Sequence, residues 1–183
     1  MSNLPINLTG KIKEIEIRKK IEKFENHLNS FDSHSSYFLV LAKLKLQIED
    51  ITGALHYLNK AFKLFPKEEF IYQMRAKILY KKKDYDGALM NLNQVIDINP
   101  KNELYYFRRG DVFFSLKIYS KAIDDYSRAI KINSLKDIYF FNRGLARGCL
   151  KDYQNAIKDF EKSLELNPKK IKVEGIIKHL KSI

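Results

Sequence analysis

Apolar residues recur along this chain at a fixed interval of 34 positions, and this pattern predicts the architecture. An aromatic residue is followed four positions later by a small residue, and these two positions hold Phe38 and Ala42, Tyr72 and Ala76, Tyr106 and Gly110, Phe140 and Gly144. An alanine, a large apolar residue and a helix-ending residue then follow, at Ala54, Leu58 and Pro66, Ala88, Leu92 and Pro100, Ala122, Tyr126 and Ser134, and Ala156, Phe160 and Pro168. A period of this length predicts stacked units, none of which can bury its apolar face alone.

Within each unit the apolar positions predict two antiparallel helices. Small and aromatic residues fall at helical spacing in two segments, which are separated by a short polar turn such as Lys82, Lys83 and Asp84. Pro100 ends its segment because proline lacks an amide donor and clashes with the preceding turn. We therefore predict eight helices between residues 35 and 168, and no strand.

Two further amphipathic segments flank the repeated region. Residues 11–30 carry Ile17, Ile21, Phe24 and Leu28 at helical spacing, and a second segment near 171–182 carries Val173, Ile176, Ile177 and Leu180. The simpler interpretation is that both segments cap the array. In the alternative, the N-terminal helix folds into the binding groove as an internal ligand.

The repeated positions resemble those of the tetratricopeptide repeat family. The resemblance implies an all-α, right-handed α-solenoid of four repeats at 35–68, 69–102, 103–136 and 137–170. It places an N-terminal segment before them at 1–34 and a capping helix after them at 171–183. The family supplies a binding scaffold that serves many unrelated pathways, so the resemblance specifies the fold more closely than the function.

Charge alone favours an anionic partner, because the chain carries a net charge of +12. Only seven of its 34 basic residues are arginine, however, and the abundance of Lys, Asn, Ile, Phe and Tyr is typical of an AT-rich genome. We therefore consider nucleic-acid binding unlikely. The sequence has no apolar run near 18 residues, no secretory signal at its start and a single cysteine, Cys149, so we expect a cytoplasmic protein without a membrane span.

No set of residues with the spacing of a catalytic or metal site occurs in the sequence. It contains no HExxH motif, no paired CxxC and no glycine loop for phosphate, so we expect a protein that is not an enzyme and needs neither cofactor nor metal. Arginines recur at the repeat interval opposite aspartates of the second helix. We expect Arg109 to pair with Asp125 and Arg143 with Asp159 as structural ion pairs.

The resemblance implies that the first helix of each repeat lines a concave surface and that ligand contacts come from its inward positions. The predicted partner-binding residues are Phe70, Lys77, Tyr80, Phe107, Arg108, Asp111, Phe114, Phe141, Asn142 and Leu145. Phe107 and Phe141 stand at equivalent places on adjacent first helices, so we expect them to be aromatic anchors. The expected ligand is a peptide or helix with apolar anchors, and Lys43, Lys77 and Arg108 favour some acidic character. Some family members grip the C-terminal carboxylates of chaperone tails, but the positions that would carry this clamp are incomplete here.

The leading hypothesis is a non-enzymatic scaffold or adaptor that holds a segment of a partner protein in its concave groove. The alternative is an RNA- or DNA-associated helical repeat protein that uses its basic surface. Salt separates the two, because phosphate contacts weaken steeply with salt whereas apolar contacts do not. The sequence leaves the oligomeric state open.

Overall fold

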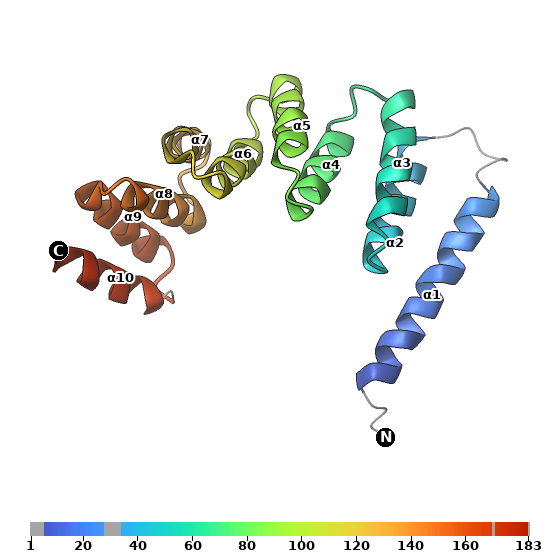
Figure 1. Cartoon of the computed structure of the whole chain (residues 1–183), viewed down its shortest axis with the longest axis horizontal. Helices are drawn as coiled ribbons and strands as arrows, with labels where there is room; N and C mark the ends of the chain where they lie inside the picture. Colours follow the sequence, from blue (N-terminus) through green and yellow to red (C-terminus); the bar gives the residue numbers. More distant parts are fainter. Residues whose placement is uncertain (1–5, 28–33, 170, 183) are drawn as a thin grey trace. The chain divides into compact units, whose positions relative to one another are not determined.

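The computed structural model describes residues 6–27, 34–169 and 171–182, and in these ranges the regular structure consists of ten helices (Figure 1). They are α1 (Ile6–His27), α2 (Ser35–Gln47), α3 (Ile51–Leu64), α4 (Glu69–Lys81), α5 (Tyr85–Ile98), α6 (Glu103–Ser115), α7 (Tyr119–Ile132), α8 (Asp137–Cys149), α9 (Tyr153–Leu166) and α10 (Ile171–Lys181). The prediction of eight repeat helices between two flanking helices is confirmed. Leu28, which we assigned to the first flanking helix, lies outside the described residues.

The chain divides into two compact units, residues 1–78 and 79–183, which we call the N-terminal and C-terminal units. The division falls inside α4, so it does not follow a boundary between repeats. No helix in the described parts of either unit is long and apolar enough to cross a membrane.

In the N-terminal unit, α1 packs against the first hairpin, α2 and α3. Ile17 and Ile21 of α1 are buried in one cluster with Leu41 of α2. The Tyr57 hydroxyl of α3 donates a hydrogen bond of 2.6 Å to Glu25 Oε1. These contacts make α1 a cover for the first hairpin.

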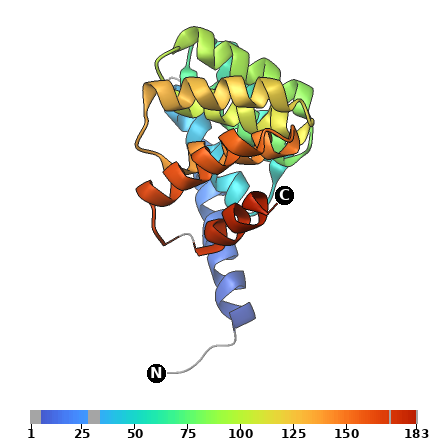
Figure 2. The ribbon, with the colours of Figure 1, turned by 90° about the vertical axis from the view of Figure 1, so that its left-hand side faces the viewer.

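The C-terminal unit contains two complete hairpins, α6 with α7 and α8 with α9, and α10 packs on α9 (Figure 2). The helices of each hairpin approach closely because their contact positions hold glycine. A Cβ atom on Gly110 would lie 2.7 Å from Cε1 of Tyr126, and one on Gly144 would lie 2.9 Å from Cε1 of Phe160. The small residue of each repeat thus leaves room for the large residue of the partner helix.

The turn inside each hairpin uses a residue in the left-handed backbone region. Glu49, Lys83, Lys117 and Lys151 have φ angles of 59°, 62°, 60° and 61°, at the interval of the repeat. In the second repeat the Asp84 amide then donates to the Leu79 carbonyl at 2.9 Å, which closes a Schellman motif. Asp84 also caps the next helix, because its side chain accepts a hydrogen bond from the Gly87 amide at 3.0 Å.

Candidate functional site

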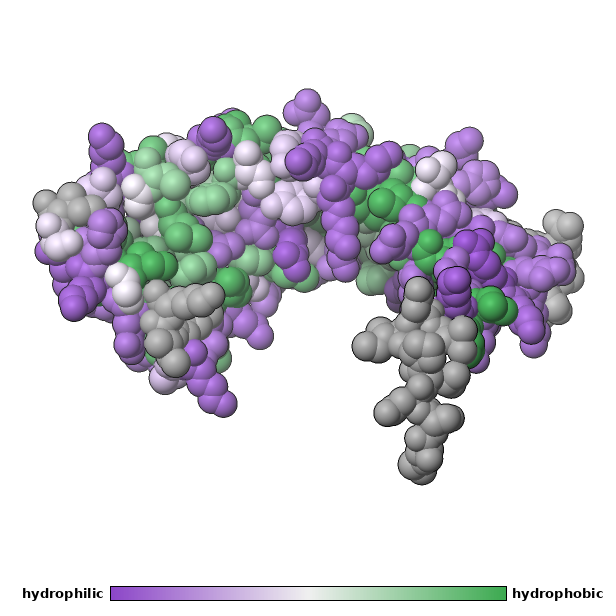
Figure 3. Space-filling view, turned by 60° about the horizontal axis from the view of Figure 1, so that its bottom comes forward, coloured by the Kyte–Doolittle hydropathy of each residue, from purple (hydrophilic) through white to green (hydrophobic). Residues whose placement is uncertain are grey.

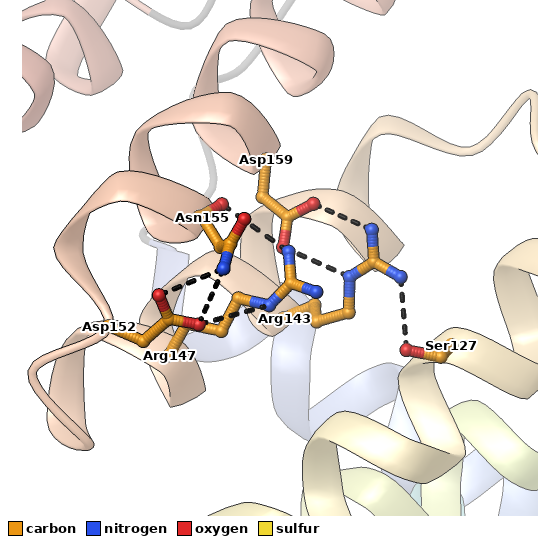
Figure 4. Close-up of polar contacts among 6 residues, drawn as sticks. All are labelled: Ser127, Arg143, Arg147, Asp152, Asn155 and Asp159. Atoms are coloured by element: carbon orange, nitrogen blue, oxygen red, sulfur yellow. Dashed lines mark hydrogen bonds and ion pairs between the residues drawn. The ribbon is translucent and has the colours of Figure 1, made fainter.

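The fourth repeat is built around a buried aspartate that two arginines share (Figure 4). Arg143 of α8 donates from Nε and Nη2 to the two carboxylate oxygens of Asp159 in α9, at 3.0 and 2.7 Å. Its third nitrogen, Nη1, donates to Ser127 Oγ of α7 at 3.0 Å. Arg147 adds a hydrogen bond of 2.8 Å to Asp159 Oδ2. One guanidinium therefore joins both helices of its own hairpin to the preceding repeat.

The third repeat has the same arrangement. Arg109 of α6 donates to both oxygens of Asp125 in α7 at 2.8 Å, and to Asn93 Oδ1 of α5 at 2.8 Å. The hydrogen bonds to Asp125 raise the pKa of Arg109 above its ordinary value, although burial acts in the opposite direction. The predicted pairs of Arg109 with Asp125 and of Arg143 with Asp159 are confirmed. These arginines belong to the framework, and ligand contacts must come from other residues.

A pocket of about 220 Å³ lies in the C-terminal unit among residues from the end of α4 and from α6, α7 and α8. We call it the Asp111 pocket, and its lining residues are Tyr80, Asp111, Phe114, Tyr126, Asn142 and Leu145. All of these except Tyr126 are among the predicted partner-binding residues. The sequence pattern did not mark Tyr126 as a site residue, because Tyr126 occupies the large apolar position of the repeat. The available signal was its hydroxyl, which Leu58, Leu92 and Phe160 lack at the same position.

The carboxylate of Asp111 is the polar centre of the pocket. Its Oδ1 accepts hydrogen bonds from the Tyr126 hydroxyl and from Asn142 Nδ2, each at 3.0 Å. Its Oδ2 lies 3.5 Å from Nη1 of Arg108. The Asp111 side chain is 16% exposed, and burial raises its pKa even though these three neighbours act to lower it. Burial and the charge of Asp111 together raise the pKa of Tyr126.

Two further hydrogen bonds, both at Ser115, border the pocket. Ser115 Oγ donates to the Asp111 backbone carbonyl at 2.9 Å, and it lies 2.9 Å from the Tyr80 hydroxyl. Since the serine proton is used on the carbonyl, Tyr80 is the donor in the second contact. The Tyr80 oxygen therefore keeps its lone pairs for another donor.

Of the two predicted aromatic anchors, Phe107 lies in the packed interior of the C-terminal unit and Phe141 lies at the edge of a buried cluster. Phe107 is 6% exposed, and its ring centroid lies 5.7 Å from that of Tyr126 and 4.7 Å from that of Tyr139. Phe141 is half-buried, and its ring centroid lies 5.7 Å from that of Phe160. It packs on the buried cluster that Phe160 forms with Val173 of α10. The expectation that Phe107 is an exposed anchor is corrected, because the next repeat places Tyr139 over it.

The remaining predicted residues are distributed over both units. In the N-terminal unit, Phe70 is half-buried with Lys43 Nζ 4.7 Å from its ring centroid, and Lys77 is exposed. Arg108, in the C-terminal unit, has a side chain that is 57% exposed. Figure 3 shows hydrophobic side chains reaching the surface of the C-terminal unit, on the left of the view, among hydrophilic ones.

Two sequence profiles of one family match the chain. The profile described as "TPR repeat" matches residues 76–117, and the profile described as "Tetratricopeptide repeat" matches residues 104–134 and 138–170. Together these matches cover half of the chain. A comparison with curated protein sequences gives no significant match.

Solved structures with the same fold include MamA and two TPR domains. MamA is 23% identical, with a TM-score of 0.79 over 93% of this chain and 99% of that chain. The Arabidopsis OM64 TPR domain is 26% identical, with a TM-score of 0.59 over 62% of this chain and 94% of that one. The first TPR of Spaghetti (RPAP3), bound to the HSP90 peptide SRMEEVD, is 24% identical, with a TM-score of 0.60 over 62% of this chain and 90% of that one.

Proposed function

The chain belongs to the tetratricopeptide repeat family, and from that premise we propose that it is a non-enzymatic interaction module that holds a segment of another protein. The observation that carries the proposal is the Asp111 pocket. The repeat pattern accounts for the aromatic, small and large apolar positions through packing, and the arginines through their ion pairs. It does not require a carboxylate, an amide, the exposed Tyr80 and the half-buried Phe114 to meet around one hollow. Residues gathered in this way are a candidate recognition surface.

The bound segment is the part of the proposal that the relatives support. The RPAP3 domain holds a peptide in its solved complex, and a peptide is the class of ligand that we propose here. The ligand itself differs, because the residues expected to complete a carboxylate clamp in this chain include Leu104 and Ile138, which cannot bind a carboxylate. A cytoplasmic adaptor remains the role that we favour.

The chemistry of the segment follows from the surface of the C-terminal unit. Phe114 and Leu145 are half-buried walls of the pocket, so they can receive apolar anchors of the ligand. The exposed head of Arg108 can receive an acidic side chain. Acidic character in the rest of the bound segment, beyond the side chain that meets Arg108, remains a prediction.

The test is selection of ligands from a displayed library of random peptides, followed by calorimetry on the selected peptides. Leu145→Arg fills the pocket and should weaken binding at least tenfold. The control for the added charge is Leu135→Arg, since Leu135 is 77% exposed outside the pocket and should tolerate the same change. Leu145 also packs on the buried cluster of Phe160 and Val173, so circular dichroism first establishes that both variants fold. Failure to select any peptide, or equal loss in both variants, would contradict the proposal. In a parallel measurement, binding of a random-sequence RNA or DNA pool with affinity that falls steeply with salt would favour the alternative of a nucleic-acid partner.

A further inference from the structure

We propose that the Asp111 pocket receives the ammonium group of a lysine side chain on the bound segment. The inference rests on the proposed function, since it specifies one contact of the segment that the module holds. It assigns to the pocket a ligand chemistry opposite to that expected beside Arg108.

The two carboxylate oxygens of Asp111 are used unequally. Oδ1 of Asp111 accepts two hydrogen bonds at 3.0 Å, from Tyr126 and Asn142. Among the described residues, Oδ2 has only the 3.5 Å contact with Arg108, whose side chain is 57% exposed and therefore well hydrated. A half-satisfied carboxylate in a mostly buried place is costly, and the raised pKa of Asp111 reflects that cost. A cation that donates to Oδ2 would offset it.

The walls of the pocket fit the rest of a lysine side chain. Phe114, Tyr126 and Tyr80 are aromatic, and an ammonium group is attracted to the face of an aromatic ring. Leu145 supplies an apolar wall against which the methylene stem can pack. The Tyr80 oxygen can accept a further hydrogen bond because its proton is donated to Ser115.

Size and geometry favour lysine over other ligands. At about 220 Å³ the pocket is smaller than the roughly 300 Å³ at which small-molecule sites begin, so it suits a single side chain. Arginine binds a carboxylate best through two parallel hydrogen bonds, and Oδ1 of Asp111 already has two donors. Lysine needs only one oxygen. A carboxylate ligand is excluded here by repulsion from Asp111.

The experiment uses peptides selected on the intact chain from the random displayed library. We expect the selected sequences to share a lysine at one position. In a synthetic peptide of the best sequence, norleucine at that position keeps the alkyl stem and removes the ammonium, and it should weaken binding about tenfold or more. Arginine at that position should restore only part of the affinity. Acetylation of the peptide's N-terminal amine should have no effect, which separates a lysine side chain from a terminal amine as the source of the ammonium.

The protein side of the experiment is Asp111→Asn, which keeps the shape of the side chain and an oxygen for Tyr126 and Asn142. It should weaken the lysine peptide about tenfold and leave the norleucine peptide unchanged. The control is Asp124→Asn, an exposed aspartate on α7. If Asp111→Asn does not fold, the double variant Asp111→Leu with Tyr126→Phe replaces it, because Leu145 and Phe160 already form this pair in the fourth repeat.

The two proposals fail in different ways. Peptides that bind through Leu145 but carry no shared lysine, or that bind Asp111→Asn as tightly as the unchanged protein, would overturn the lysine contact and leave the interaction module standing. Loss of affinity on acetylation of the terminal amine, with none on norleucine substitution, would also overturn it. If no peptide is selected, both proposals fall together.

Discussion

The third and fourth repeats share one framework and differ in the surface that they offer. Arg109 and Arg143 make the same bidentate contact with an aspartate and the same reach to the preceding repeat. At positions one interval apart, however, Asp111 of the third repeat corresponds to Leu145 of the fourth, and Tyr126 corresponds to Phe160. The carboxylate and the hydroxyl that bonds it are present together or absent together. The framework is therefore separable from the pocket chemistry, and the carboxylate and its tyrosine partner both belong to the third repeat.

The framework itself differs in one respect. Asp159 binds a second arginine, Arg147, and the place equivalent to Arg147 in the third repeat holds Phe113. Asp125 has one arginine partner where Asp159 has two. The four predictions below use these differences, in order of expected effect.

The largest effect is expected from removal of the shared aspartates. Both carboxylates are only 4% exposed, and loss of either leaves a guanidinium group in a largely buried place. Asp125→Ala should lower the free energy of unfolding by about 2 to 3 kcal/mol, and Asp159→Ala by about 3 to 4 kcal/mol because it removes a carboxylate that two arginines share. Urea melts measure both. Losses no larger than that of the exposed control Asp124→Ala would show that the ion pairs are not the source of stability. Equal losses in the two variants would show that the second arginine, Arg147, adds nothing.

Gly110→Ala and Gly144→Ala test whether the polar pocket stiffens its hairpin. A Cβ atom would lie 2.7 Å from Tyr126 and 2.9 Å from Phe160, so each variant should lose about 1 to 2 kcal/mol. Gly110→Ala should lose more, because the hydrogen bond to Asp111 holds the Tyr126 ring in place. Gly148→Ala is the matched control. A Cβ there meets nothing within 4 Å, and the helix should gain up to about 1 kcal/mol. A loss in the control equal to that of Gly110→Ala would refute the packing explanation.

A helix cap distinguishes the third repeat from the second. Asp84 caps its helix through the Gly87 amide, whereas Ile118 at the equivalent position has no side-chain hydrogen bond and is 41% exposed. Ile118→Asp should therefore raise the free energy of unfolding by about 0.5 to 1 kcal/mol in thermal melts. Asp84→Ala should lower it by a similar amount. If neither variant changes the free energy of unfolding, the cap does not contribute to the stability of these hairpins.

The smallest effect is the dependence of stability on the charge of Asp111. Burial raises its pKa in the folded protein, so between the unfolded and folded pKa values the folded protein binds more protons. Its free energy of unfolding therefore falls as the pH rises through that window. Asp111→Asn lacks this dependence, so the variant should gain stability relative to the unchanged protein as the pH rises from about 3 to about 7. Parallel urea melts measure the difference, and the opposite slope would show that Asp111 is stabilised as a carboxylate.

The sequence pattern predicted the helices and the arginine pairs because both depend on residues that repeat at one interval. Five residues of the Asp111 pocket are among the partner contacts that the family resemblance implied, because they lie at inward positions of successive first helices, and their role in binding stays a prediction. The burial of Phe107 was not predicted, because it depends on Tyr139 of the next repeat rather than on its own helix. The bond between Tyr126 and Asp111 was missed for a similar reason. It joins two residues that have separate explanations in the sequence, and only their proximity in space gives the pair a role.

The reach of the arginines also affects how the C-terminal unit unfolds. Arg109 and Arg143 each bind one residue in the following helix and one in the preceding repeat, so each is an energetic coupling between neighbouring repeats. In a linear array, strong coupling of this kind favours opening of all repeats together over unzipping from one end. Hydrogen exchange should accordingly give the amides of α7 and α9 nearly the same opening free energy. A surface held in this way keeps its geometry until the whole unit is lost.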